Sequence, residues 1–248
     1  MRIPITMCHG VEREAQGRAP LTAEHFDGLM GIVHEMGFKS ITYDDLAAWR
    51  AGQRELPTRP IMLDFDHPMK SMCREVLGTL QRYGFKGNLF VNTGMLGPVY
   101  RAPWPRGAAE IMTWEDMRDL MAAGWQMGAH TVSHPNLSEL SVEDPSGERL
   151  RAELEENDAT LEQELGVKPR DFAFTGTSWS SVAEREVKAR YRFGRLWIVG
   201  ADYNVDGKAM RYADLVVCRG RTKRTAGRHR RRATLPTRVT HTVCHRWS

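Results

Sequence analysis

The fold is decided by the stretch Pro60-Ile61-Met62-Leu63-Asp64-Phe65-Asp66-His67-Pro68. Its first half is an apolar run that begins at proline, which is typical of a strand buried on both faces of a parallel sheet. Asp64 and Asp66 share one face of that strand, and His67 follows where the chain turns at Pro68. Such polar groups are costly to bury without partners, so they indicate either a functional site or, taken alone, a turn with solvated acids.

Strands and helices alternate on both sides of this stretch. Short apolar runs predict strands at residues 3–7, 40–42, 88–91, 126–129, 172–174, 196–199 and 215–218. Helical periodicity, capping residues and terminal glycines predict helices at residues 22–36, 43–50, 70–83, 113–124, 148–165 and 182–189. The alternation predicts an α/β fold whose parallel sheet is covered by helices and is either open or closed into a barrel. In such folds the chemistry lies at the carboxyl ends of the strands.

A second polar cluster, His130-Thr131-Val132-Ser133-His134, follows the expected strand at 126–129. Two histidines four residues apart can meet one metal ion if the segment is a helical turn, and two ordinary histidines are the alternative. Together with His67 they make three imidazoles beside a carboxylate, which is the donor set of an open site for a divalent metal. The metal would lower the pKa of a bound water, and Asp66 would take its proton as general base. The predicted reaction is hydrolysis of an acyl group without an organic cofactor.

Length and composition narrow the class of protein. The chain has 248 residues, which fits one α/β domain with a sizeable core. No apolar run approaches the roughly 18–20 residues of a membrane span, and the first ten residues lack the pattern of a signal peptide. We therefore expect a cytoplasmic protein. The four cysteines are scattered and form no CxxC pair, so reduced thiols are expected.

The charge is distributed unevenly along the chain. Residues 219–248 contain nine Arg, one Lys and no acid, so the net charge of +4 for the whole chain leaves residues 1–218 at −6. A basic run can contact phosphate or nucleic acid, but a solvated tail is the commoner case, and we expect no nucleic-acid partner. We predict two regions: a catalytic domain at residues 1–218 and an irregular basic tail at residues 219–248.

The order and spacing of these motifs resemble the polysaccharide deacetylases with the NodB homology domain, over about residues 1–218. Residues 3–9 are similar to the family's opening strand, and residues 63–68 stand where the family has Thr-Phe-Asp-Asp-Gly. Residues 130–134 match its His-Ser/Thr-x-x-His motif. The resemblance implies an irregular (β/α) barrel, with Asp66 as catalytic base and His130 and His134 as metal ligands. The family's third ligand is an aspartate, and here that position is His67.

Other positions depart from the family pattern. Thr175-Gly176-Thr177 stands where the family continues Pro-x-Gly near the substrate, and a backbone N–H near Gly176 could serve an oxyanion. Trp197 and Asp202 loosely resemble later pocket residues, for which an ordinary strand is the alternative. The closing Leu-x-x-His motif, whose histidine acts as general acid in the family, has no match after Cys218, because the surroundings of His241 and His245 differ.

The resemblance therefore implies a metal-dependent hydrolase that removes an N-acetyl or O-acetyl group from a carbohydrate or related small amide. One divalent ion is expected, zinc first, with cobalt, nickel or manganese as alternatives. A catalytically inactive protein that binds a carbohydrate is the alternative function. The sequence indicates no membrane span and no particular oligomeric state.

Overall fold

The computed structural model describes residues 3–11, 21–101, 110–176, 178–197, 202–205, 208–211 and 242–246. Its main sheet has eight strands: β1 (Ile5–Cys8), β2 (Lys39–Ser40), β3 (Pro60–Asp66), β4 (Asn88–Val91), β5 (Gln126–Ala129), β6 (Asp171–Ala173), β8 (Phe193–Trp197) and β11 (Thr242–Arg246). The order is β1-β3-β4-β5-β6-β8-β11, with β2 beside β3. All neighbours are parallel except β11, which runs antiparallel to β8.

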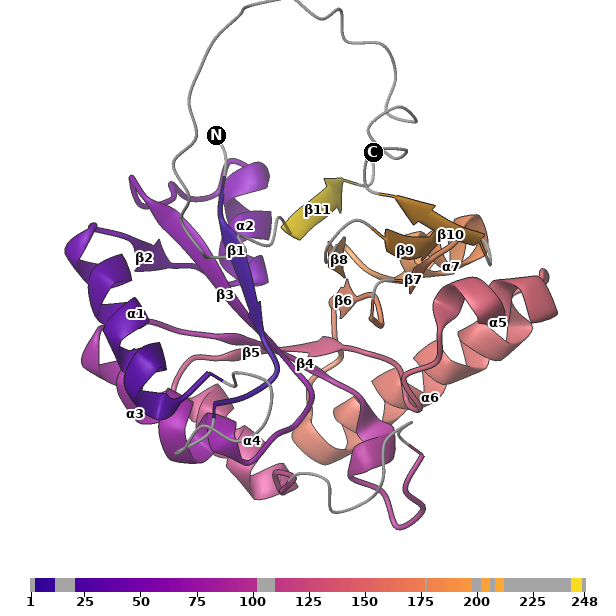
Figure 1. Ribbon diagram of the computed structural model, residues 1–248, viewed down its shortest axis with the longest axis horizontal. Helices are drawn as coiled ribbons and strands as arrows, with labels where there is room; N and C mark the ends of the chain where they lie inside the picture. Colours follow the sequence, from indigo (N-terminus) through magenta and orange to yellow (C-terminus); the bar gives the residue numbers. More distant parts are fainter. Residues whose placement is uncertain are drawn as a thin grey trace, which may run out of the picture.

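Helices pack around this sheet (Figure 1). They are α1 (Ala23–Glu35), α2 (Tyr43–Arg50), α3 (Leu77–Arg82), α4 (Trp114–Ala122), α5 (Leu137–Glu143), α6 (Glu148–Leu165) and α7 (Ser181–Arg190). Residues of α2 join a cluster on the inner face of the sheet. A π-helical turn, η1 (Met72–Val76), leads into α3, and a 3-10 turn, η2 (Thr93–Met95), follows β4. A small second sheet contains β7 (Ser178–Trp179), β9 (Asp202–Val205) and β10 (Lys208–Arg211). The sheet curls so that β11 lies near β1, which gives the irregular (β/α) barrel expected from the sequence.

The helix starts follow from capping chemistry. Thr42 and Thr113 each form a capping box, in which the threonine oxygen accepts from the N3 backbone and the N3 aspartate accepts from the threonine N–H. At the other end, α6 stops at Gly166, whose backbone is left-handed (φ +69°). Glycine adopts this conformation without a steric penalty, so the helix ends where the sequence predicts.

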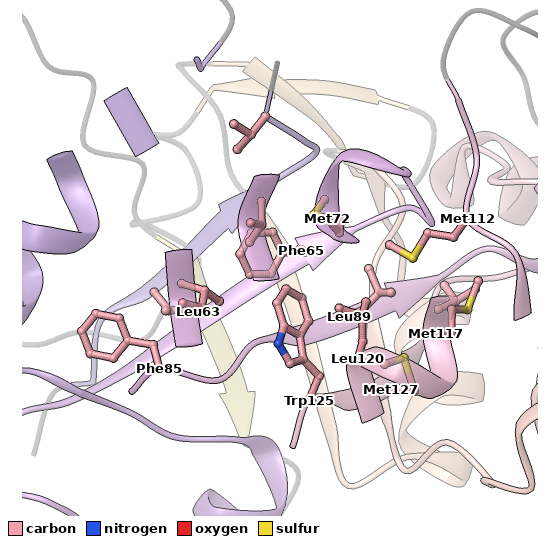
Figure 2. Close-up of a cluster of buried hydrophobic side chains, with 14 of the residues drawn as sticks. Leu63, Phe65, Met72, Phe85, Leu89, Met112, Met117, Leu120, Trp125 and Met127 are labelled. Carbon is pink, nitrogen blue, oxygen red and sulfur yellow. The ribbon is translucent and has the colours of Figure 1, made fainter. Parts of the chain in front are cut away.

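Strand β3 is buried along its whole length because both of its faces are covered. Leu63 and Phe65 face the helices, where Phe65 packs against Trp125 with ring centroids 4.9 Å apart (Figure 2). Met62 belongs to a separate cluster on the other face, inside the curl of the sheet, and Asp64 and Asp66 point to that same face. The acids are therefore forced into the protein interior by the register of an otherwise apolar strand.

The structure differs from the sequence prediction at several elements. The expected helix at 70–83 begins as η1, because Pro68 and Lys70 before it are tied by backbone hydrogen bonds to Met112 and Glu110. Helix α5 was not predicted, and β8 begins at Phe193 rather than at 196. The expected strand at 215–218 lies outside the described residues.

Most of the predicted tail also lies outside the described residues, and the domain boundary at 218 stays a prediction. Within the tail the structure describes only residues 242–246, which form β11 instead of an irregular segment. Pairing with β8 satisfies backbone groups that would otherwise be unpaired at the edge of the sheet. Among the described side chains, Cys8 and Cys73 are free thiols, as expected. No helix in the described part of the chain is long and apolar enough to cross a membrane.

Candidate metal centre

The end of β3 brings Asp66 and His67 to the carboxyl edge of the sheet. Both side chains are buried, and His67 has a left-handed backbone (φ +69°) that turns its ring away from the strand. Its Nδ1 lies 2.9 Å from Oδ1 of Asn92, a fully buried residue directly after β4. Because an amide oxygen only accepts hydrogen bonds, Nδ1 carries the proton and Nε2 has the lone pair that can bind a metal.

The end of β5 supplies His130 in the same way. Nδ1 of His130 lies 2.8 Å from the carbonyl oxygen of Ala173 on β6, so this nitrogen donates. Its Nε2 is buried and has no hydrogen-bond partner. A buried polar atom without a partner is costly, and a metal ion would satisfy it.

His134 approaches His130 through a turn that is not helical, so the two histidines meet without the helical turn considered for the His-x-x-x-His segment. Thr131 and His134 both have left-handed backbones, with φ of +65° and +57°. The turn is closed by the N–H of His134, which donates to Oγ1 of Thr131 at 3.1 Å. Left-handed backbone costs a non-glycine residue about 1–2 kcal/mol, so other contacts must hold this turn.

The three histidines converge on one point. Their ligand nitrogens all lie within 4.8 Å of one another, and the ring centroids of His67, His130 and His134 are 4.9–5.1 Å apart. Two nitrogens bound to the same zinc are separated by about 3.4 Å, given a Zn–N distance of about 2.1 Å, so small side-chain rotations would complete the site. The residues present therefore fit a divalent metal.

These imidazoles are neutral at pH 7. Burial, together with the neighbouring histidines, lowers the pKa of His67 to about 4, and burial lowers the pKa of His134 to about 4. The pKa of His130 is well below its usual range for the same reason, although the charge of Asp66 opposes these shifts. A neutral imidazole is the form that binds metal, so the site needs no deprotonation near pH 7.

Asp66 is paired with a cation that the sequence did not reveal. Arg195, on β8, is fully buried and donates from Nη2 to Oδ1 of Asp66. Burial alone would raise the pKa of Asp66, but the charge of Arg195 outweighs it and, with the nearby histidines, holds that pKa well below its usual range. Asp66 is therefore ionised across the neutral range.

The same guanidinium also faces Asp64. Nε of Arg195 lies 3.1 Å from Oδ2 of Asp64, which accepts hydrogen bonds from Tyr43 Oη at 2.7 Å and, at Oδ1, from Asn88 Nδ2 at 3.0 Å. Burial raises the pKa of Asp64 to about 7, against the attraction of Arg195. One buried arginine is thus shared by two carboxylates, one ionised and one that titrates near neutrality.

Three residues of this region were not predicted from the sequence to belong to the site. Arg195 is separated from Asp66 by 129 positions, and no spacing rule connects them. Asn92 directly follows a predicted strand, as the other site residues do, and that position was the available signal. His9 stacks on His67 with ring centroids 5.0 Å apart and an interplanar angle of 16°.

The four expected substrate or oxyanion contacts remain predictions. Thr175 is buried and its hydroxyl donates to the carbonyl of Pro135, the residue after His134. Gly176 has a left-handed backbone (φ +55°) beside open space. Trp197 ends β8 and Asp202 begins β9, but their side chains lie outside the described part of the structure. His241 is likewise not described, and His245 is described only by its backbone pairing with Gly194.

Known proteins are similar to this chain in sequence and in fold. YxkH of Bacillus subtilis (strain 168), which is named for the polysaccharide deacetylases, is 20% identical over 147 residues, or 59% of this chain and 48% of that protein. The chain thus spans about half the length of this curated relative. The deacetylase PplD of Streptococcus pyogenes, solved in complex with acetate, has a similar fold, with a TM-score of 0.65 and 18% identity over 77% of this chain and 81% of that one. IcaB from Ammonifex degensii gives a TM-score of 0.64 and 18% identity over 84% and 88% of the two chains.

The sequence pattern of the polysaccharide deacetylase family matches the part of this chain that carries the candidate centre. The match extends over residues 53–193, which is more than half of the chain and includes β3 through the start of β8. The chain therefore belongs to the polysaccharide deacetylase family.

Proposed function

We propose that this protein is a metal-dependent hydrolase that removes an acetyl group from a carbohydrate. The observation that carries the proposal is the convergence of three neutral histidines, one with a buried and unpartnered Nε2, beside an ionised aspartate. Imidazole nitrogens in a three-ligand set with an open position suit zinc, with cobalt, nickel or manganese as alternatives. The deacetylase names of the family and of PplD support the acetyl group, and the family name supports a carbohydrate substrate.

In this proposal His67, His130 and His134 hold the ion, which when bound supplies Lewis acidity and lowers the pKa of water. Asp66 does not bind the metal and accepts a proton from the attacking water at its carboxylate. Arg195 fixes the orientation of that carboxylate through Nη2 and keeps it ionised. The carbonyl of Ala173 and the amide of Asn92 fix the tautomers of two of the ligands.

The first experiment is elemental analysis of the purified protein, beside the variants His67→Ala and His130→Ala. About one divalent ion per chain is expected in the wild type, and both variants should lose it. A wild type without metal after incubation with zinc, cobalt or nickel would refute the proposed centre. Metal that stays in both variants would refute the assignment of the ligands.

The second experiment measures acetate release from acetylated oligosaccharides by the wild type and by Asp66→Asn. The variant should keep its metal and lose turnover, because the amide cannot accept the proton. A fully active Asp66→Asn would exclude Asp66 as the base. Metal binding without turnover on any acetylated substrate would favour the alternative, an inactive protein that binds a carbohydrate.

A further inference from the structure

The turn that carries two of the candidate ligands is bound on its outer side by helix α6. Two of its residues have left-handed backbones, and the N–H of His134 donates to Oγ1 of Thr131 across it. The first half of the turn is nevertheless fully buried, at Thr131 and Val132. Its geometry must therefore be fixed by the residues packed against it.

Glu153 on α6 makes three of these contacts. Its Oε2 accepts from the backbone N–H of Val132 at 2.9 Å and of Ser133 at 2.8 Å, and its Oε1 accepts from the Ser133 hydroxyl at 2.7 Å. Hydrogen bonds to a carboxylate are about twice as strong as those between neutral groups. One side chain thus satisfies the two backbone donors between the left-handed residues.

Asn157 lies one helical turn further along α6, on the same face. It is fully buried, and its Nδ2 lies 2.6 Å from the carbonyl of Thr131 and 3.0 Å from the carbonyl of Val91, at the end of β4. Asn92, the partner of His67, is the next residue after Val91. Asn157 therefore connects the turn that holds His130 and His134 to the strand end that orients His67.

The turn also contacts η2 closely at Gly94. The N–H of Gly94 donates to the carbonyl of Val132 at 3.0 Å, and a Cβ at Gly94 would lie 2.5 Å from that oxygen. The turn thus contacts both η2 and α6, and these protein contacts hold its backbone.

We propose that Glu153 and Asn157 are positioning residues that hold His130 and His134 in the geometry of the metal site. This inference rests on the proposed metal centre. Neither side chain contacts the ion, and their effect reaches it through the backbone of residues 131–133. Removal of such supporting contacts typically lowers metal affinity by about 10–100-fold.

The test is a titration of the metal-free full chain with Co²⁺, followed by its visible absorption, and with Zn²⁺ against a chelating competitor. Glu153→Ala should lower the affinity by about 10–100-fold and change the cobalt spectrum. Glu153→Gln should stay within a few-fold of the wild type, because an amide oxygen still accepts from both backbone N–H groups. The matched control is Glu162→Ala, an exposed glutamate on the same helix, which should bind as the wild type does.

The outcomes separate the two proposals. If the wild type binds Co²⁺ and Glu153→Ala binds it equally well, the positioning role is refuted and the metal centre stands. If the wild type binds neither ion, the metal centre fails and the positioning role fails with it. If Glu153→Ala does not fold, as judged by circular dichroism, Glu153→Asp decides: its carboxylate is one methylene too short to reach both N–H groups, and wild-type affinity in that variant would refute the role.

Discussion

Asp64→Asn isolates the ionisation of one buried carboxyl. In the wild type, Asp64 is fully buried and its pKa is raised to about 7 from the ordinary 3.8. The folded protein therefore holds this proton more tightly than the unfolded chain does. For a carboxyl whose folded pKa is raised, the stabilisation is complete below the unfolded pKa and is lost as the pH rises through the folded pKa. Asparagine has nearly the same shape and cannot ionise.

The size of the effect follows from the shift. Three pKa units correspond to about 4 kcal/mol over the full range, at about 1.4 kcal/mol per unit. At pH 5 the wild type keeps about 3 kcal/mol of this stabilisation, and at pH 8 it keeps almost none. The difference in unfolding free energy between wild type and Asp64→Asn should therefore change by about 2–3 kcal/mol between these two pH values, in favour of the variant at pH 8.

The assay is urea unfolding of both metal-free proteins at pH 5, 6, 7 and 8. Any constant offset, such as a poorer contact between the amide and Arg195, cancels in the comparison across pH. Asp66 is ionised at all four values and the histidines are common to both proteins, so Asp64 alone generates the slope. A difference that stays constant from pH 5 to pH 8 would show that Asp64 does not titrate there, and the shared arginine would have to be reinterpreted.

Three further outcomes are expected. The pKa of His67 is lowered to about 4, so the neutral ring stabilises the folded protein fully above about pH 6.5 and less as the pH falls. In the same unfolding assay, the unfolding free energy of the metal-free wild type should fall by about 2 kcal/mol by pH 5 relative to that of His67→Gln. Asn92→Ala removes the acceptor for Nδ1 of His67, and Zn²⁺ affinity measured by chelator competition should fall about 10–100-fold, whereas an unchanged affinity would show that the tautomer is set elsewhere. Phe172→Ala empties a fully buried position against Phe174 and Tyr191 and should lower the unfolding free energy by about 3–5 kcal/mol, and a loss below about 1 kcal/mol would mean that the core refills.

Elements with strong local signals were predicted from the sequence. Helices α2 and α6 and strands β4 and β5 have the predicted bounds, because caps, glycine stops and short apolar runs mark their ends. Helix α5 was missed because no element was predicted between residues 135 and 148. Its N-cap, Asn136, was nevertheless present as a signal, and its side chain accepts from two N–H groups.

The candidate site was predicted in part for a similar reason. His67, His130 and His134 follow strands whose carboxyl ends meet, so the parallel topology brings them together. The left-handed turn could not be foreseen, because neither Thr131 nor His134 favours that conformation. Arg195 could not be foreseen either, because a single arginine in a strand has no local feature that identifies its distant partner.

The position of Arg195 gives the candidate site an order of assembly. A ribosome that adds about 5–20 residues per second makes Asp64 and Asp66 roughly 6–26 s before it makes Arg195. A nascent chain that ends before β8 contains all three histidines but has two carboxylates facing an interior without their cation. Burial of that interior is unfavourable until β8 pairs with β6, so the sheet has an electrostatic reason to remain open at this seam during synthesis. Pairing of β8 with β6 and completion of the charged centre are thus one event, which occurs late in synthesis.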